Sequence, residues 1–169
     1  MKKLFLILLS TFAALVVGVL VSAALKPNEY RIIRTALFSH PPEQIFTYVG
    51  DLQKWELWSP WKEMDPTTQN TYPGPTTGQG ATMSWTGQKS GSGSLTFTQV
   101  VPNQSIRYKL IFKDWESETE GEIVIATQAG TGKTQVSWTM FGKNTFMEKI
   151  FWVIFRMESA ISKDFDRGL

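Results

Sequence analysis

Three side chains have the chemistry of an acid–base catalyst, but none of them lies in a catalytic motif. His40 is the only histidine, and Tyr108 and Asp51 are the other candidates for moving a proton. Such a group must lie within hydrogen-bond reach of the reacting atom, in a site that adjusts its pKa. His40 directly precedes Pro41 at an expected strand-to-helix corner, which is usually a surface position. We therefore assign no catalytic residue from the sequence.

A glycine-rich segment at residues 130–134 resembles the end of a phosphate-binding loop. The full motif needs a glycine five residues before Gly132, where this chain has Thr127. It also needs a following helix, whereas a strand is expected here. We interpret residues 130–134 as a hairpin turn. The second glycine-rich stretch, at residues 87–93, is expected to be a flexible hairpin loop that could cover a pocket.

An acidic run alternates along the chain at Asp114, Glu116, Glu118, Glu120 and Glu122. At the two-residue period of a strand the last three share one face, which indicates a solvated sheet face. The spacing differs from that of an EF-hand loop, and the absence of cysteine excludes thiolate ligands. We expect neither a metal site nor a cofactor.

Tryptophan is the most unusual component of the sequence. Three tryptophans fall within the seven residues 55–61, and two more lie in expected strands. Aromatic side chains dominate cores, so core packing is the simplest interpretation. Apolar pockets are also lined by such rings, which supports a ligand-pocket hypothesis. Its candidate residues are Trp55, Trp58, Trp61, Trp85, Phe97, Tyr108, Leu110, Trp138, Ile150 and Ile154.

Most of these residues lie in segments that alternate between apolar and polar side chains. In residues 105–112, Ile106, Tyr108 and Leu110 share one face, and Arg107 and Lys109 lie opposite. This period of two predicts antiparallel strands with one buried face. The expected strands are residues 30–38, 81–86, 94–101, 105–112, 118–127 and 133–141, with a further short strand near residues 68–72.

Helices are expected at two places in the domain. Pro41 and Pro42 can begin a short helix that ends at Gly50, and Asp51 can cap a second one through Trp55. From Asn144 onward, apolar residues recur every three or four positions, which predicts a long amphipathic C-terminal helix. Its first half is apolar nearly all round. We therefore expect that half to touch a second apolar body, which could be a ligand, the tryptophan-rich loop or a membrane.

These features together resemble the SRPBCC superfamily, the START-related helix-grip proteins, and more narrowly its bacterial polyketide cyclase/dehydrase-type members. The matching segments are residues 42–51, 55–61, 78–85, 102–107, 136–140 and the last helix with Gly168-Leu169. The resemblance implies an α+β fold in which a curved antiparallel sheet of six to seven strands wraps around a long C-terminal helix, with two short helices after the first strand. It also implies relatives that bind lipids, sterols or hormones, and a few cyclases.

The N-terminal segment is long enough to cross a bilayer. Residues 4–25 carry no charge, and Lys2 and Lys3 precede them, which favours a cytoplasmic N-terminus. A cleaved signal peptide is the alternative, since small residues occur around Ala23, although its apolar region is usually shorter. We expect an anchor at residues 1–25, a linker at 26–29 and the SRPBCC domain at 30–169.

The sequence favours one function and leaves two alternatives open. Acidic and basic residues nearly balance, with 17 Lys and Arg against 15 Asp and Glu, which argues against nucleic acid as a partner. The leading hypothesis is a membrane-anchored domain outside the cytoplasm that binds a hydrophobic small molecule or lipid between sheet and C-terminal helix. The alternatives are a cyclase or dehydratase on the same fold, and a non-catalytic partner domain in an envelope complex that uses the apolar face around residues 151–155.

Overall fold

The computed structural model describes residues 2–169, which divide into two compact units. The helical unit comprises the residues up to Tyr30 together with residues 143–160. The sheet unit comprises residues 31–142 and 161–169. The chain therefore begins in the helical unit and continues through the sheet unit. It then contributes residues 143–160 to the helical unit and ends in the sheet unit.

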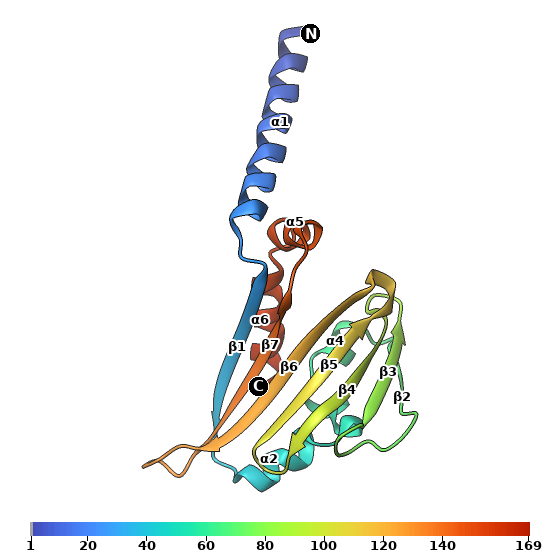
Figure 1. Cartoon of the computed structure of the whole chain (residues 1–169), viewed down its shortest axis with the longest axis vertical. Helices are drawn as coiled ribbons and strands as arrows, with labels where there is room; N and C mark the ends of the chain where they lie inside the picture. The colour runs from blue at the N-terminus through green and yellow to red at the C-terminus, as the bar shows by residue number, and fades with distance from the viewer. Residues whose placement is uncertain (1) are drawn as a thin grey trace. The chain divides into compact units, whose positions relative to one another are not determined.

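The sheet has seven strands in the order β1-β7-β6-β5-β4-β3-β2 (Figure 1). Each neighbouring pair from β2 to β7 is antiparallel. This confirms the predicted antiparallel α+β helix-grip fold, including the short strand near residue 70. The strands are β1 (Glu29–Phe38), β2 (Gln69–Thr71), β3 (Thr82–Gly87), β4 (Gly91–Val101), β5 (Ser105–Phe112), β6 (Ser117–Thr127) and β7 (Thr134–Lys143).

The alternation in the sequence becomes the two faces of this sheet. On β5, Ile106, Tyr108 and Leu110 are buried, whereas Arg107 is exposed. The polar face carries cross-strand ion pairs, because Lys109 lies opposite the acidic residues of β6 and its Nζ is 2.6 Å from Glu118. The last three residues of the acidic run, Glu118, Glu120 and Glu122, thus lie on a solvated sheet face, as predicted. Within residues 2–169 no group of acidic or histidine side chains is arranged to hold a metal ion.

Several short helices follow β1, and the last two contain the tryptophan-rich stretch. They are α2 (Pro42–Val49), the 3-10 helix η1 (Leu52–Lys54), α3 (Trp55–Trp58) and α4 (Trp61–Met64); a further 3-10 turn, η2 (Lys113–Trp115), precedes β6. Pro42 stands in the first turn of α2, where its missing N–H costs nothing. Asp51 accepts the Gln53 amide at 3.1 Å and so caps η1. The segment is more finely divided than the two predicted helices.

The predicted C-terminal helix is present but divided into α5 (Phe146–Ile154) and α6 (Met157–Gly168). The break falls at Arg156, whose φ of 50° lies in the left-handed region. Such a residue costs about 1–2 kcal/mol and interrupts the helical hydrogen bonds. Neither proline nor glycine marks the break. What changes there is polarity, because α5 is almost wholly apolar and α6 is charged.

The helical unit contains α1 (Lys2–Leu25), the linker after it, α5 and the first turn of α6. Among residues 2–169, α1 is the one helix long and apolar enough to cross a membrane. Its length and composition suit either a membrane anchor or a signal sequence.

Candidate functional site

The interior of the sheet unit is built around an aromatic cluster of Trp55, Trp58, Trp61, Phe97, Tyr108, Trp138 and Phe165. Trp55 is at its centre, with ring centroids 4.9 Å from Trp58, 5.5 Å from Tyr108 and 6.2 Å from Trp138. Many of these contacts are tilted or edge-to-face, which aromatic rings prefer. The cluster brings together six of the ten residues predicted from the sequence to line a pocket.

Two sets of elements position these rings. Phe97, Tyr108 and Trp138 come from the buried faces of β4, β5 and β7, where Phe97 is directly paired with Tyr108. Trp55 is fixed from α3, because its Nε1–H donates to the backbone oxygen of Val49 at 2.9 Å. Trp58 and Trp61 lie on α3 and α4, two helices of four residues each. The buried face of the sheet therefore forms one side of the cluster, and the short helices α3 and α4 form the opposite side.

α6 closes the cluster from the C-terminal end. The ring of Phe165 stacks on Trp138 with centroids 4.0 Å apart and planes 3° apart. Gly168 lies so close that a Cβ there would be 2.8 Å from the Trp138 ring. In the sequence, Phe165 is only one of the apolar residues of the predicted C-terminal helix. Its partnership with Trp138 depends on packing between distant segments, so the pocket hypothesis missed it.

The cluster contains a single polar pair that no sequence motif signals. The Trp138 Nε1–H donates to the Tyr108 hydroxyl oxygen at 2.6 Å, and both side chains are fully buried. Burial raises the pKa of Tyr108, because the phenolate would be poorly solvated. Tyr108 is therefore a neutral phenol at physiological pH. Within residues 2–169, the Tyr108 hydroxyl accepts this hydrogen bond and donates none.

Room for Tyr108 comes from a glycine on the next strand. Gly121 of β6 is paired with Tyr108, and a Cβ at Gly121 would clash with the phenol ring. The glycine lets a large ring lie flat across β6 toward Trp138 on β7. Close approach of this kind is one of the roles of glycine within a strand.

Burial falls from the centre of the cluster toward α3 and α4. Trp55, Tyr108 and Trp138 are inaccessible, whereas Trp58 and Trp61 are partly exposed. The Trp58 Nε1–H has only a long contact, 3.4 Å, with the Tyr48 backbone oxygen. Trp58 and Trp61 therefore form the accessible rim of the cluster.

The other four predicted pocket residues lie elsewhere. Leu110 is buried on β5 and is paired with Leu95. Trp85 forms a separate contact with Phe112, at 5.7 Å between ring centroids. Ile150 and Ile154 are on α5 in the helical unit, where Ile150 is half-buried and Ile154 is exposed. Whether any of the ten contacts a ligand stays a prediction.

The acid–base candidates do not share a site. His40 is exposed, and its backbone oxygen accepts the Thr134 hydroxyl at 2.7 Å. Asp51 caps η1, and Tyr108 is in the aromatic cluster. Residues 130–133 of the glycine-rich segment lie in the turn between β6 and β7, and Thr134 begins β7. Gly130 and Gly132 adopt positive φ there, as a tight turn requires.

Asp65 has a structural role that the sequence did not reveal. Its buried carboxylate accepts the Thr67 hydroxyl at 2.5 Å and the amides of Lys89 and Ser90 at 2.9 and 2.8 Å. These bonds, led by the one from Thr67, hold the pKa of Asp65 well below its usual range. The β3–β4 hairpin, expected to be flexible, is thus tied to the loop after α4.

Solved structures of other proteins share this fold at low sequence identity. An NMR structure from Thermobifida fusca aligns with a TM-score of 0.59 and 15% identity, covering 79% of this chain and 83% of that one. A crystal structure from Mycobacterium smegmatis gives 0.53 and 16%, covering 81% and 87%. The Aha1 dimer from Colwellia psychrerythraea gives 0.50 and 18%, covering 76% and 91%. No curated protein matches the sequence.

A curved antiparallel sheet, short helices after its first strand and a C-terminal helix on its buried face, together with a family-model match over most of the chain, define a helix-grip protein of the SRPBCC superfamily, a ligand-binding kind of fold. Within it, the chain belongs to the family described as Activator of Hsp90 ATPase homolog 1-like protein, whose model matches residues 39–156. The narrower resemblance to polyketide cyclase/dehydrase-type members stays a prediction.

Proposed function

We propose that this protein is a membrane-anchored binding domain for a hydrophobic small molecule or lipid, and that the aromatic cluster is its binding site. The observation that carries the proposal is the buried Tyr108 hydroxyl, the one hydroxyl group among the side chains of the aromatic cluster. Its oxygen accepts the Trp138 N–H, and its proton is free for an acceptor. Ligand sites typically combine apolar walls with a few such polar groups.

The ligand would enter from the rim at Trp58 and Trp61. The rings of the cluster are in contact, so binding requires some of them to separate. Trp58 and Trp61 are suited to this because they are partly exposed and lie on short helices. Burying apolar ligand surface contributes about 25 cal/mol per Å², less the cost of ordering. A carbonyl or hydroxyl oxygen on the ligand would accept the Tyr108 proton.

Anchoring places this domain at the membrane, where hydrophobic ligands concentrate. α1 has 24 residues, enough for the apolar thickness of a bilayer. Lys2 and Lys3 at its start favour a cytoplasmic N-terminus and a domain outside the cytoplasm.

Catalysis of the cyclase or dehydratase type has less support. Tyr108 is the one titratable group of the cluster, and burial keeps it protonated, so it is a hydrogen-bond donor rather than a base. His40 is exposed and outside the cluster, and the Asp51 carboxylate caps η1. Binding without chemistry is therefore the function that we propose.

The proposal is tested by native mass spectrometry of the full-length protein purified from membranes. We expect a bound hydrophobic molecule, and we expect the double variant Trp58→Ala, Trp61→Ala to lose it. Trp115→Ala is the matched control, because Trp115 is exposed and outside the cluster. Repeated absence of any bound molecule from the folded wild type, or equal retention by the double variant, contradicts the proposal.

A further inference from the structure

α5 has the opposite burial pattern to an ordinary surface helix, with a charged side chain buried and apolar side chains exposed. Its one fully buried side chain is Lys149, only 6% exposed. Its most exposed side chains are Met147, Phe151 and Ile154, at 62%, 57% and 54%, with Phe155 directly after the helix at 61%. The spacing of four, three and one places these four residues on one face. We call this face the apolar stripe.

Hydrogen bonds fix the opposite face of the helix. The Lys149 ammonium donates to the backbone oxygen of Lys26 and to Oδ1 of Asn28, both at 3.1 Å. The amide of Asn144 donates to the backbone oxygen of Asn28 at 2.7 Å, and Trp152 packs on Tyr30 with centroids 4.3 Å apart. The linker after α1 therefore holds the polar side of α5, and the stripe must face outward.

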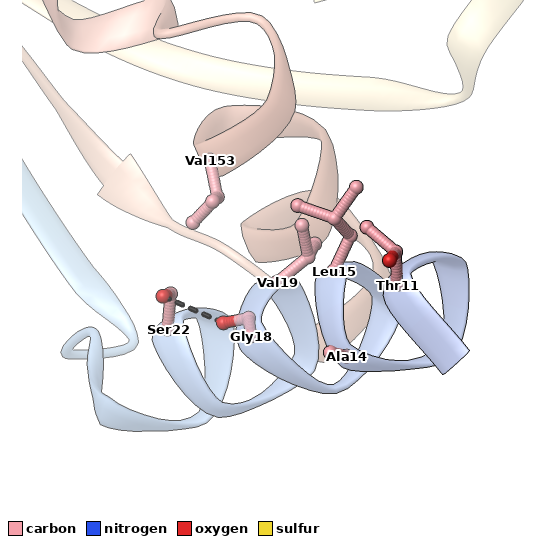
Figure 2. A pocket seen from close by; sticks show the side chains of 7 residues that line it. All are labelled: Thr11, Ala14, Leu15, Gly18, Val19, Ser22 and Val153. Atoms are coloured by element: carbon pink, nitrogen blue, oxygen red, sulfur yellow. Dashed lines mark hydrogen bonds between the residues drawn. The ribbon is translucent and has the colours of Figure 1, made fainter. Parts of the chain in front are cut away.

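α5 also lies against α1 within the helical unit, through a residue outside the apolar stripe. Val153 is beside Gly18 and Ser22 in the C-terminal half of α1, and with residues between Thr11 and Ser22 it lines an open apolar groove of about 420 Å³ (Figure 2). The hydroxyls of Thr11 and Ser22 on this side donate to backbone oxygens of α1 itself, at 2.9 and 2.7 Å. Polar groups satisfied internally in this way are what a lipid environment requires.

The distribution of charge on α5 fits a membrane interface. Residues 150–155 contain no charged side chain. Glu148 is used in the capping box with Thr145, and Lys149 is turned inward. Arg156 directly follows the segment and is exposed, so it can meet lipid headgroups, whereas Lys143 before the helix is paired with Glu29 at 3.2 Å.

We propose that α5 is an interfacial membrane helix whose apolar stripe inserts into the bilayer that α1 crosses. The inference rests on the anchoring part of the proposed function. It adds that the protein has a second membrane contact, contributed by a segment more than a hundred residues after the anchor in the chain. A bilayer is favoured over a protein partner because the stripe lies in the same unit as α1, whose length and apolar composition suit a bilayer.

The absence of cysteine makes a direct test straightforward. Four full-length single-cysteine variants each carry an environment-sensitive fluorophore. Phe151→Cys and Met147→Cys place it on the apolar stripe, and Leu15→Cys places it on α1. Lys133→Cys, on an exposed turn, is the aqueous control. Each is placed, one chain per disc, in nanodiscs of phosphatidylcholine and phosphatidylglycerol. Quenching is measured with iodide in the water and with nitroxide on the acyl chains.

We expect the labels at residues 151 and 147 to resist iodide several-fold better than the label at 133, and to be quenched by the lipid nitroxide. Iodide access equal to that of the control overturns the inference. If Leu15→Cys is still protected, anchoring stands and only the role of α5 fails; if it is also accessible, the anchoring proposal fails too. Protection that appears only with two chains per disc, without nitroxide quenching, assigns the stripe to a second copy and also overturns the inference.

Discussion

The indole of Trp138 and the phenol of Tyr108 are joined by a hydrogen bond of 2.6 Å in the fully buried interior of the sheet unit. The two residues lie on β7 and β5, with β6 between them. Tyr108 reaches across β6 because the residue opposite it there is Gly121. One polar bond thus links β5 to β7 across β6 inside an aromatic cluster, and it is the feature on which the proposed ligand site depends.

Tyr108→Phe should destabilise the protein by about 1–3 kcal/mol, because it leaves the buried Trp138 N–H without an acceptor. Chemical denaturation followed by circular dichroism measures this. Tyr48→Phe is the matched control, since Tyr48 is exposed, and should change the free energy of unfolding by less than about 0.5 kcal/mol. Equal effects in the two variants would show that the buried hydrogen bond contributes nothing.

Gly121→Ala should also destabilise the fold, by about 1–3 kcal/mol, because the new methyl group overlaps the Tyr108 ring. Gly74→Ala is the control, since nothing lies within 4 Å of a Cβ at that position. If shape is the cause, Gly121→Ala should cost less in a Tyr108→Leu background than in the wild type. Thermal unfolding of the single and double variants decides the point, and an unchanged melting temperature for Gly121→Ala refutes the steric argument.

Asp65 should make stability depend on pH in the acid range. Its folded-state pKa is lowered, chiefly by the Thr67 hydroxyl, so its stabilisation is complete above the ordinary value of 3.8 and is lost as pH falls below it. Urea unfolding across this range should show wild-type stability falling toward low pH, and a shallower fall for Asp65→Asn. Glu43→Gln, which replaces an exposed carboxylate, serves as the control for charge alone. Identical acid slopes for wild type and Asp65→Asn would be inconsistent with this role.

Lys149→Met should loosen the helical unit, because the ammonium holds the backbone oxygen of Lys26 and the side chain of Asn28. Hydrogen exchange by mass spectrometry should then show faster exchange around residues 26–30 and at Asn144. Lys143→Met is the comparison: Lys143 is largely exposed, and its ion pair with Glu29 at 3.2 Å is a surface pair worth little. Unchanged exchange in Lys149→Met would mean that the linker is held by other contacts.

The strands and the membrane-length helix were determined by the sequence itself. Both are local signals, since alternation along β5 or an uncharged run of apolar residues in α1 is visible within a single segment. The acidic face of β6 and the turn at residues 130–134 were predicted for the same reason.

The division of the last helix was beyond the sequence, because Arg156 is neither proline nor glycine and the helical period continues across it. The role of Asp65 was likewise hidden, since its partners at residues 89 and 90 are brought to it by the fold.

The sequence alone determined that the protein is an antiparallel α+β domain, rich in tryptophan, with an apolar N-terminal helix. Only the tertiary structure decided which rings meet: Trp55, Tyr108, Trp138 and Phe165 come from four elements, and Trp85 packs elsewhere. It also decided that Lys149 is buried while Phe151 is exposed. The physical reason is that alternation and helical period define the faces of one element, whereas contacts between elements depend on how those faces are brought together in space.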